Sequence, residues 1–406
     1  MRCGGECPDE PLVRRKRDWV IVVVGIGADG IAGLTGESVA QLRRAHTVYG
    51  SRRQLALLDD SVAARRREWP SPLLPALRSL PDDVHVLASG DPLLHGIGAT
   101  LVGLFGPDRV DVLPHVSSVT LACARLGWTV QDTEVVSLVT AAPHTAVRRG
   151  GCAVVLSRDG STPSALARLL CQAGRGESLI HVLEQLGGSG ERRRDATAAQ
   201  WAAAPPKDVD DLNVVAVQYL PDERMAFPPD DAFDHDGQLT KHGVRAVTLA
   251  TLAPRPGELL WDVGAGSGSI AVMWALGAPG CSAVAFERDE QRRERIVRNA
   301  VTFGAAIEVR GTAPDTFEGA TEPSAIFVGG GLTQPGLLQA CFDRLPANGR
   351  LIANAVTAES EAALAQWYSS MGGELRRYQH YTGEPLGKFT GWRPAMPVTQ
   401  WAVTKR

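Results

Sequence analysis

Two apolar segments that each end in a glycine-rich turn constrain the fold of this chain most strongly. The segment at 20–24 leads into GIGADG at 25–30, and the segment at 259–263 leads into GAGSG at 264–268. A strand that enters a glycine turn before a helix is typical of α/β folds with a ligand site, because glycine allows close backbone approach and a helix N-terminus offers free N–H groups. Since the sequences after the two turns differ, we predict two separate α/β modules and not a repeat.

The chain of 406 residues is long enough for two or three domains of about 150 residues each. The stretch 221–236 is rich in proline and aspartate, which is typical of an extended linker. We therefore predict an N-terminal module at 19–221, a linker at 222–235 and a C-terminal module at 236–406. Residues 1–18 are expected to form a disordered tail.

The N-terminal module is predicted to contain two lobes with a cleft between them. The boundary is expected near Leu113-Pro114, which gives lobes at about 19–113 and 114–221. After the first glycine turn, strands are predicted at 84–88, 110–113, 135–139, 153–156, 179–183 and 214–220, with a helix at 163–172.

Composition argues against several classes of function. A net charge of -3 and a pI near 6.3 disfavour a nucleic-acid partner. The apolar runs are too short to span a membrane, and the first 18 residues lack the apolar stretch of a secretion signal. Seven cysteines without a CxxC pair indicate neither a disulfide framework nor a metal site. We therefore expect a cytoplasmic protein with no membrane or nucleic-acid partner and no metal.

The second glycine turn has the stronger signal for a cofactor. The strand predicted at 283–286 ends in Glu287, about 20 positions after the first glycine of the turn, where a carboxylate can accept hydrogen bonds from ribose hydroxyls. The spacing is GxGxG, whereas a dinucleotide pyrophosphate prefers GxGxxG. The segment therefore resembles the class I methyltransferase fold, which binds S-adenosylmethionine. Methyltransferases that act on nucleobase amines have a Pro-Pro-aromatic segment after the strand that corresponds to 324–328. This chain has three glycines at that place, which argues against a nucleobase amine as substrate.

Further motifs make the resemblance closer: DGQLTK at 236–241, VRA at 244–246, GTAP at 311–314 and VGGG at 328–331. As a set they resemble the C-terminal half of the precorrin-6Y C5,15-methyltransferase (decarboxylating) family, over 236–406. This chain departs from the family pattern at two positions. Gly243 stands where the family often has an acidic residue, and Thr312 stands where it often has an aspartate. The resemblance implies these cofactor-binding residues: Thr240, Gly264, Ala265, Gly266, Ser267, Gly268, Glu287 and Ala313.

The first glycine turn fits GxGxxG but lacks the acidic residue that a dinucleotide site needs. Gly90-Asp91-Pro92 follows a predicted strand, and Pro114-His-Val-Ser117-Ser118 follows another. Together these signals resemble the tetrapyrrole (class III) methyltransferases, over about 19–220, in which two lobes hold S-adenosylmethionine in a cleft. The resemblance implies these cofactor-binding residues: Gly25, Gly27, Gly90, Asp91, Pro92, Ser117 and Ser118.

The two resemblances imply one enzyme, a two-lobed class III methyltransferase fused to a Rossmann-like class I methyltransferase. They imply methylation of a precorrin at C5 and C15 with loss of carbon dioxide from the ring C acetate, the precorrin-6B to precorrin-8 step of cobalamin biosynthesis. The implied cofactor is S-adenosylmethionine, with S-adenosylhomocysteine as product. A homo-oligomer is also expected, since the C-terminal relatives form tetramers.

Three cations beside the second glycine turn are candidates for binding substrate carboxylates: Lys241, His242 and Arg245. His95 and His115 lie beside the predicted N-terminal cleft and are interpreted as structural, so no catalytic base is assigned. Three alternatives stay open at this point. They are an RNA methyltransferase, an NAD(P)-dependent oxidoreductase and a non-catalytic sensor of S-adenosylmethionine.

Overall fold

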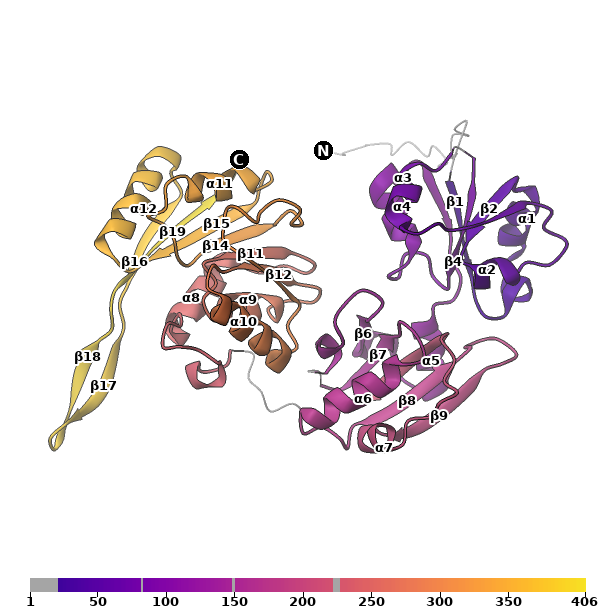
Figure 1. Ribbon diagram of the computed structural model, residues 1–406, viewed down its shortest axis with the longest axis horizontal. Coiled ribbons are helices and arrows are strands. Elements are labelled where there is room, and N and C mark those ends of the chain that lie inside the picture. The colour runs from indigo at the N-terminus through magenta and orange to yellow at the C-terminus, as the bar shows by residue number, and fades with distance from the viewer. Residues whose placement is uncertain (1–20, 82, 148–149, 222–226) are drawn as a thin grey trace, which may run out of the picture. The chain divides into compact units, whose positions relative to one another are not determined.

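The computed structural model describes residues 21–81, 83–147, 150–221 and 227–406 (Figure 1). The predicted tail at 1–18 and part of the predicted linker lie outside the described residues. The chain forms two compact units: the first contains two five-stranded sheets, and the second contains a seven-stranded and a two-stranded sheet. This architecture confirms the predicted fold class, a two-sheet α/β module followed by a Rossmann-like one.

The first sheet is entirely parallel, in the order β3-β2-β4-β1-β5. Val24 of β1, an interior strand between β4 and β5, packs with Leu42, whereas Val23 packs with Val86 and Leu101. Both faces of this strand are thus buried, which explains its continuous apolar run. The strands are β1 (Ile21–Ile26), β2 (Thr47–Gly50), β3 (Arg65–Glu68), β4 (His85–Ser89) and β5 (Val110–Leu113), and the helices are α1 (Gly36–Arg44), α2 (Arg52–Ala56), α3 (Leu73–Arg78) and α4 (Ile97–Phe105).

The second sheet is mixed, in the order β6-β7-β10-β8-β9, with only β6 and β7 parallel. Its edge strand carries Arg192 and Arg194, which both pair with the buried carboxylate of Glu184. Charged side chains on an edge strand oppose pairing with another sheet. The elements are β6 (Thr133–Ser137), β7 (Cys152–Leu156), β8 (Leu179–Glu184), β9 (Arg192–Thr197), β10 (Asn213–Gln218), α5 (Ser118–Leu126), α6 (Thr162–Gln172) and α7 (Ala198–Ala203).

The third sheet has the order β13-β12-β11-β14-β15-β19-β16, in which β19 runs antiparallel to both of its neighbours. The strand order reverses between β11 and β14, and ligands of open α/β sheets bind beyond the carboxyl ends of the strands at such a point. The strands are β11 (Leu259–Val263), β12 (Ser282–Phe286), β13 (Ile307–Arg310), β14 (Ala325–Val328), β15 (Arg350–Ala355), β16 (Glu374–Tyr378) and β19 (Val398–Thr404). The helices are α8 (His242–Leu252), α9 (Ser269–Ala275), α10 (Glu290–Phe303), α11 (Leu337–Arg344) and α12 (Ala358–Met371).

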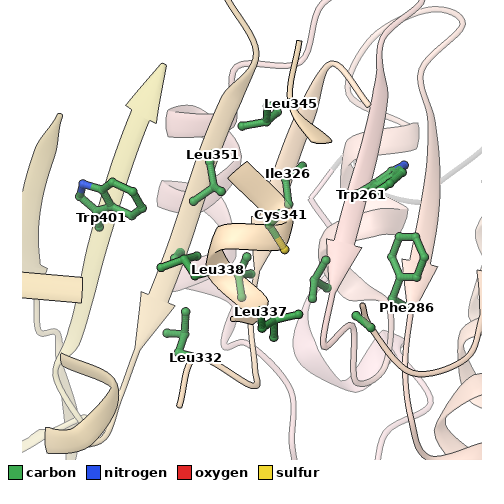
Figure 2. Close-up of a cluster of buried hydrophobic side chains, with 14 of the residues drawn as sticks. Trp261, Phe286, Ile326, Leu332, Leu337, Leu338, Cys341, Leu345, Leu351 and Trp401 are labelled. Carbon is green, nitrogen blue, oxygen red and sulfur yellow. The ribbon is translucent and has the colours of Figure 1, made fainter. Parts of the chain in front are cut away.

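One face of this sheet is covered by α11 and by a set of large apolar side chains (Figure 2). Trp261 packs between Phe286 and Phe317, with ring centroids 5.0 and 4.7 Å away. Its indole N–H donates to the carbonyl of Thr321 at 2.9 Å, so the buried nitrogen is satisfied. Cys341 of α11 is fully buried in the same cluster, and burial raises the pKa of its thiol to about 12.

A two-stranded hairpin, β17 (Tyr381–Leu386) and β18 (Phe389–Pro394), extends from the seven-stranded sheet between β16 and β19 (Figure 1). Along the described chain, no helix combines the length and the apolar character that a bilayer crossing requires. Within the same residues, no group of three or more His, Cys, Asp or Glu side chains is placed to hold a metal ion.

Candidate functional site

The glycine turn after β11 uses the conformational freedom of all three of its glycines. Gly264, Gly266 and Gly268 have φ values of +70°, +60° and +73°. A Cβ on Gly264 would lie 2.8 Å from the backbone nitrogen of Gly330, and one on Gly268 would lie 2.9 Å from the side chain of Ile296. A Cβ on Gly266 would meet nothing closer than 3.8 Å. The first and third glycines therefore allow packing within the protein, whereas Gly266 faces open space where a ligand can approach the backbone.

Glu287 holds this turn in place. Its Oε2 accepts a hydrogen bond from the amide of Gly266 at 2.8 Å, and its Oε1 accepts one from the amide of Asp289 at 3.0 Å. The side chain is 5% exposed and lines the adjoining cavity. A carboxylate has about four lone-pair sites, so two backbone bonds leave capacity for ribose hydroxyls. The predicted ribose contact stays a prediction, and the structure adds a positioning role for the same side chain.

Asp262 is a site residue that the sequence analysis missed. It is 1% exposed, and its Oδ2 accepts a hydrogen bond from the amide of Ala271 at 3.1 Å. Its Oδ1 is buried without a hydrogen-bond partner among the described residues. Burial, together with the charge of Glu287, raises the pKa of Asp262 to about 7. An acidic residue two positions before the first glycine of the turn was a signal available in the sequence.

A cavity of about 940 Å³ lies against this turn, at the strand-order reversal. It is large enough for a cofactor and part of a substrate, since small-molecule sites span about 300–1,000 Å³. The predicted cofactor residues that line it are Thr240, Gly264, Ala265, Gly266, Ser267, Glu287 and Ala313. Gly268 does not line it. His380 and Met396, at the base of the hairpin, lie in the same wall.

The three candidate cations lie in different environments. Lys241 lines the cavity, and its exposed ammonium lies 3.9 Å from a carboxylate oxygen of Asp230. His242 lies outside the cavity lining, with its Nε2 3.3 Å from the carbonyl of Phe227. Of the three, Lys241 is therefore the one whose side chain lines the cavity.

Arg245 has a different role from the one expected, because its side chain is fully buried and lies outside the cavity lining. Its guanidinium donates to the carboxylate of Asp230 at 2.5 Å, to the carbonyl of Thr240 at 2.8 Å and to the carbonyl of Pro228 at 2.7 Å. The ring of Phe233 covers it at 4.8 Å. Arg245 thus joins the segment before α8 to the module interior and cannot reach a substrate.

Two further arginines line the same cavity, and the sequence analysis did not select them. Arg292 donates to Asp236 at 2.9 Å and to Gln238 at 2.8 Å, so its guanidinium is already engaged. The exposed side chain of Arg288 forms no ion pair within the described part of the chain. Arg288 thus has no ion-pair partner among these residues, and Lys241 has only the long contact of 3.9 Å with Asp230, so these two cations are less engaged than Arg292.

The first module has a separate cavity of about 400 Å³, lined by residues of both of its sheets. Of the predicted residues, Gly27, Gly90 and Ser118 line it. A Cβ on Gly25 would lie 2.2 Å from the carbonyl oxygen of Gly90, so glycine at position 25 allows the two turns to touch. Residues of the second sheet that line the cavity, such as Asn213, could not be linked to this site from sequence spacing.

Four predicted residues of the first module do not line its cavity: Gly25, Asp91, Pro92 and Ser117. The Oδ1 of Asp91 accepts a hydrogen bond from the amide of Leu93 at 2.9 Å, which closes the turn. Ser117 is the N-cap of α5, and its hydroxyl accepts from the amide of Thr120 at 3.0 Å. These residues shape the loops that surround the cavity.

The two histidines of the first module also occupy different positions. His95 lines the cavity with a φ of +53°. His115 lies behind the first glycine turn, with its Nε2 3.4 Å from Asp29 and close to the position that a Cβ on Gly27 would take. His115 therefore supports the turn together with Asp29.

Comparison with known proteins gives matches over both modules. Residues 20–202 match the tetrapyrrole (corrin/porphyrin) methylases, and residues 231–405 match the precorrin methyltransferase domain. The precorrin-6Y C(5,15)-methyltransferase (decarboxylating) of Mycobacterium tuberculosis (strain CDC 1551 / Oshkosh) is 68% identical over 390 residues, which are 95% of this chain and 100% of that protein. A protein of the same name from Sinorhizobium sp is 43% identical over 404 residues, 95% of this chain and 96% of its own length.

A solved structure is also similar, that of the C-terminal domain of precorrin-6Y C5,15-methyltransferase from Rhodobacter capsulatus. It is 41% identical, covers 46% of this chain and 100% of its own chain, and has a TM-score of 0.42. The identity to curated relatives over nearly the whole length decides the classification. The chain belongs to the precorrin-6Y C5,15-methyltransferase (decarboxylating) family.

Proposed function

We propose that this chain transfers two methyl groups from S-adenosylmethionine to a precorrin, at C5 in the first module and at C15 in the second. In the second module, carbon dioxide also leaves the ring C acetate. The observation that carries the proposal is the presence of two separate cavities, each against a glycine turn, in a chain of this family. Cobalamin biosynthesis in the cytoplasm is the corresponding pathway and location.

The second cavity fits S-adenosylmethionine by the chemistry of its walls. Gly266 leaves room for close approach of a ligand to the backbone, and Glu287 has lone pairs free for ribose hydroxyls. When bound, the cofactor supplies a methyl group activated by a sulfonium. The Oδ1 of Asp262 is buried and has no hydrogen-bond donor among the described residues. It can therefore accept a hydrogen bond from a group of the ligand.

The residues of this chain act mainly by binding and orientation. The nucleophile is a ring carbon of the precorrin, so no side-chain nucleophile is required, and holding the reacting atoms in line accounts for much of the rate. We infer that Lys241 and Arg288 bind carboxylates of the substrate at the second cavity. When the ring C acetate is held in this way, the bond to its carboxylate breaks, carbon dioxide leaves and the electron pair passes into the conjugated macrocycle. A proton from water then converts the remaining methylene to a methyl group.

We further propose that the chain is a homo-oligomer that assembles through the hairpin. Cross-strand partners share a face, which places Tyr381, Trp392 and Pro394 on one side, and residues Tyr381 and Trp392 are 55% and 74% exposed. A two-stranded hairpin alone is only marginally stable in water. A second copy of the chain, with the same apolar face, is the partner that we infer, and a tetramer is the expected state.

A mass balance tests the proposed function. Incubation of the protein with reduced precorrin and labelled S-adenosylmethionine should add two methyl groups and remove one carbon dioxide. Gly266→Arg places a bulky side chain at a positive φ in the second cavity and should abolish methylation at C15 and decarboxylation while methylation at C5 continues. Loss of both methylations, or of neither, contradicts the division of labour.

The same preparation separates the alternatives. Calorimetric titration with S-adenosylhomocysteine should reveal two sites, whereas a nicotinamide dinucleotide should show no binding. Saturable binding of a nicotinamide dinucleotide in either cavity would favour an oxidoreductase. Labelled methyl groups recovered in RNA, and none in the tetrapyrrole, would favour an RNA methyltransferase. Two bound S-adenosylhomocysteine molecules without any methylated product would favour a sensor.

A further inference from the structure

We propose that Arg53 is the residue that binds a carboxylate of the tetrapyrrole in the first cavity. The inference rests on the proposed function of the first module and names the side chain that selects its substrate. No motif in the sequence drew attention to Arg53, because it lies outside the glycine turns and the Gly-Asp-Pro segment.

Arg53 has a fixed position in the cavity wall. It belongs to α2, which begins at a capping box formed by Ser51 and Gln54. Its Nη2 donates to the hydroxyl of Ser89 at 2.7 Å, and the side-chain Nε2 of Gln54 donates to the same oxygen at 3.0 Å. Ser89 ends β4 and directly precedes Gly90. The guanidinium is therefore held beside the turn that lines the predicted cofactor site.

The charge of Arg53 is available to a ligand. In the ranges that the structure describes, Arg53 has no carboxylate within ion-pair distance, whereas its neighbour Arg52 pairs with Glu68 at 3.4 Å. Partial burial lowers the pKa of the Arg53 guanidinium, and the more distant charge of Asp210 opposes this shift. A guanidinium has five N–H donors, so one bond to a neutral hydroxyl leaves a fork for a carboxylate.

The surroundings of Arg53 favour the substrate over the cofactor. Trp69 lines the same cavity and stacks on Tyr49 with ring centroids 5.1 Å apart, and Leu94 and Val139 add to the apolar wall. An apolar wall with one unpaired cation fits an apolar macrocycle that has acidic side chains. S-adenosylmethionine has a sulfonium, an ammonium and only one carboxylate, so its net positive charge is repelled by a cation that has no carboxylate within ion-pair distance.

The test compares four variants of the full chain. Arg53→Gln should raise KM for the precorrin in methylation at C5 by roughly tenfold or more, with kcat within about twofold, because charge-assisted hydrogen bonds contribute about 1.5–3 kcal/mol. Arg53→Lys keeps the charge without the fork and should be intermediate. Arg52→Gln, on the same helix but outside the cavity, is the matched control and should behave as wild type. Ser89→Ala removes the internal partner but keeps the cation and should leave KM nearly unchanged.

A labelled methyl group distinguishes C5 from C15 by NMR, and calorimetry gives the affinity for S-adenosylhomocysteine. Equal KM values for Arg53→Gln and Arg52→Gln would overturn the inference. So would a loss of S-adenosylhomocysteine affinity as large as the rise in KM, or a Ser89→Ala variant that reproduces Arg53→Gln. Failure of the proposed function would instead be visible in the wild-type protein, as a lack of methylation at C5.

Discussion

Asp262, in β11, and Glu287, directly after the adjacent parallel strand β12, each accept a backbone hydrogen bond that fixes the segment from the glycine turn into α9. Glu287 accepts a hydrogen bond from Gly266 within the turn, and Asp262 accepts one from Ala271 in the helix that follows. The strands pair in register, with Asp262 opposite Ala285. Burial, and next to it the charge of Glu287, disfavour the ionised form of Asp262 and so raise its pKa.

Asp262→Asn should change how stability depends on pH. Because the folded-state pKa of about 7 lies above that of an exposed aspartate, about 4, the folded protein retains a proton that the unfolded chain loses between these values. Wild-type stability therefore falls relative to the asparagine variant as pH rises from 4 to 7, by up to roughly 4 kcal/mol. Urea unfolding of both proteins at several pH values measures the difference, and a difference that stays constant with pH would contradict it.

Glu287→Gln should weaken cofactor binding in the second cavity. A glutamine presents one oxygen in place of two, so one of the amides of Gly266 and Asp289 loses its acceptor. We expect the affinity for S-adenosylhomocysteine to fall roughly tenfold or more at this site, with the first cavity unaffected. Calorimetry reports both sites, and Glu290→Gln, in the exposed first turn of α10, is the control that should change neither.

Arg245→Met should destabilise the second module. The substitution leaves one carboxylate oxygen of Asp230 and two carbonyls without their donor, and each buried polar group left unsatisfied costs about 1–3 kcal/mol. Lys241→Met, at the exposed neighbour of the same carboxylate, should change stability by less than about 1 kcal/mol but should raise KM for methylation at C15. If the two variants had similar free energies of unfolding, the buried contacts of Arg245 would contribute little to stability.

Trp392→Ser tests the proposed assembly. The residue is 74% exposed on the apolar face of the hairpin, so loss of its indole should dissociate the oligomer without lowering the stability of the isolated subunit by more than about 1 kcal/mol. Light scattering after size exclusion measures the mass. Arg393→Ser, on the opposite face of the same strand, should leave the oligomer intact, and an unchanged mass for both variants would reject the hairpin as the interface.

The parts of the fold that the sequence predicted well are those with local signals. Strands expected at 110–113 and 259–263 are the observed β5 and β11, because both are apolar runs bounded by turn residues. Edge strands such as β3 and β9 were not predicted, because their charged sequences have no apolar alternation. Their position in the sheet comes from pairing with neighbours that are distant in the chain.

The prediction of the candidate sites was limited in the same way, because sequence patterns report on local structure and not on contacts between distant segments. Glycine spacing was sufficient to select Gly264, Gly266 and Glu287, since the turn and its acidic partner are close in sequence. It could not assign Arg245, because a basic residue on a helix gives no sign of whether it faces a cavity or the interior. Arg53 was missed for the opposite reason: its relation to Ser89 exists only once α2 packs beside the end of β4.

The position of β19 also affects how the second module folds. This strand pairs with β15 on one side and β16 on the other, and its Trp401 is fully buried. The whole segment from α12 through the hairpin must therefore be looped out before the sheet is complete. Closure of such a loop costs entropy before any contact compensates for it. Because this cost grows only slowly with loop length, shortening β17 and β18 by matched residues would remove the surface proposed for assembly and leave the folding of this module nearly unchanged.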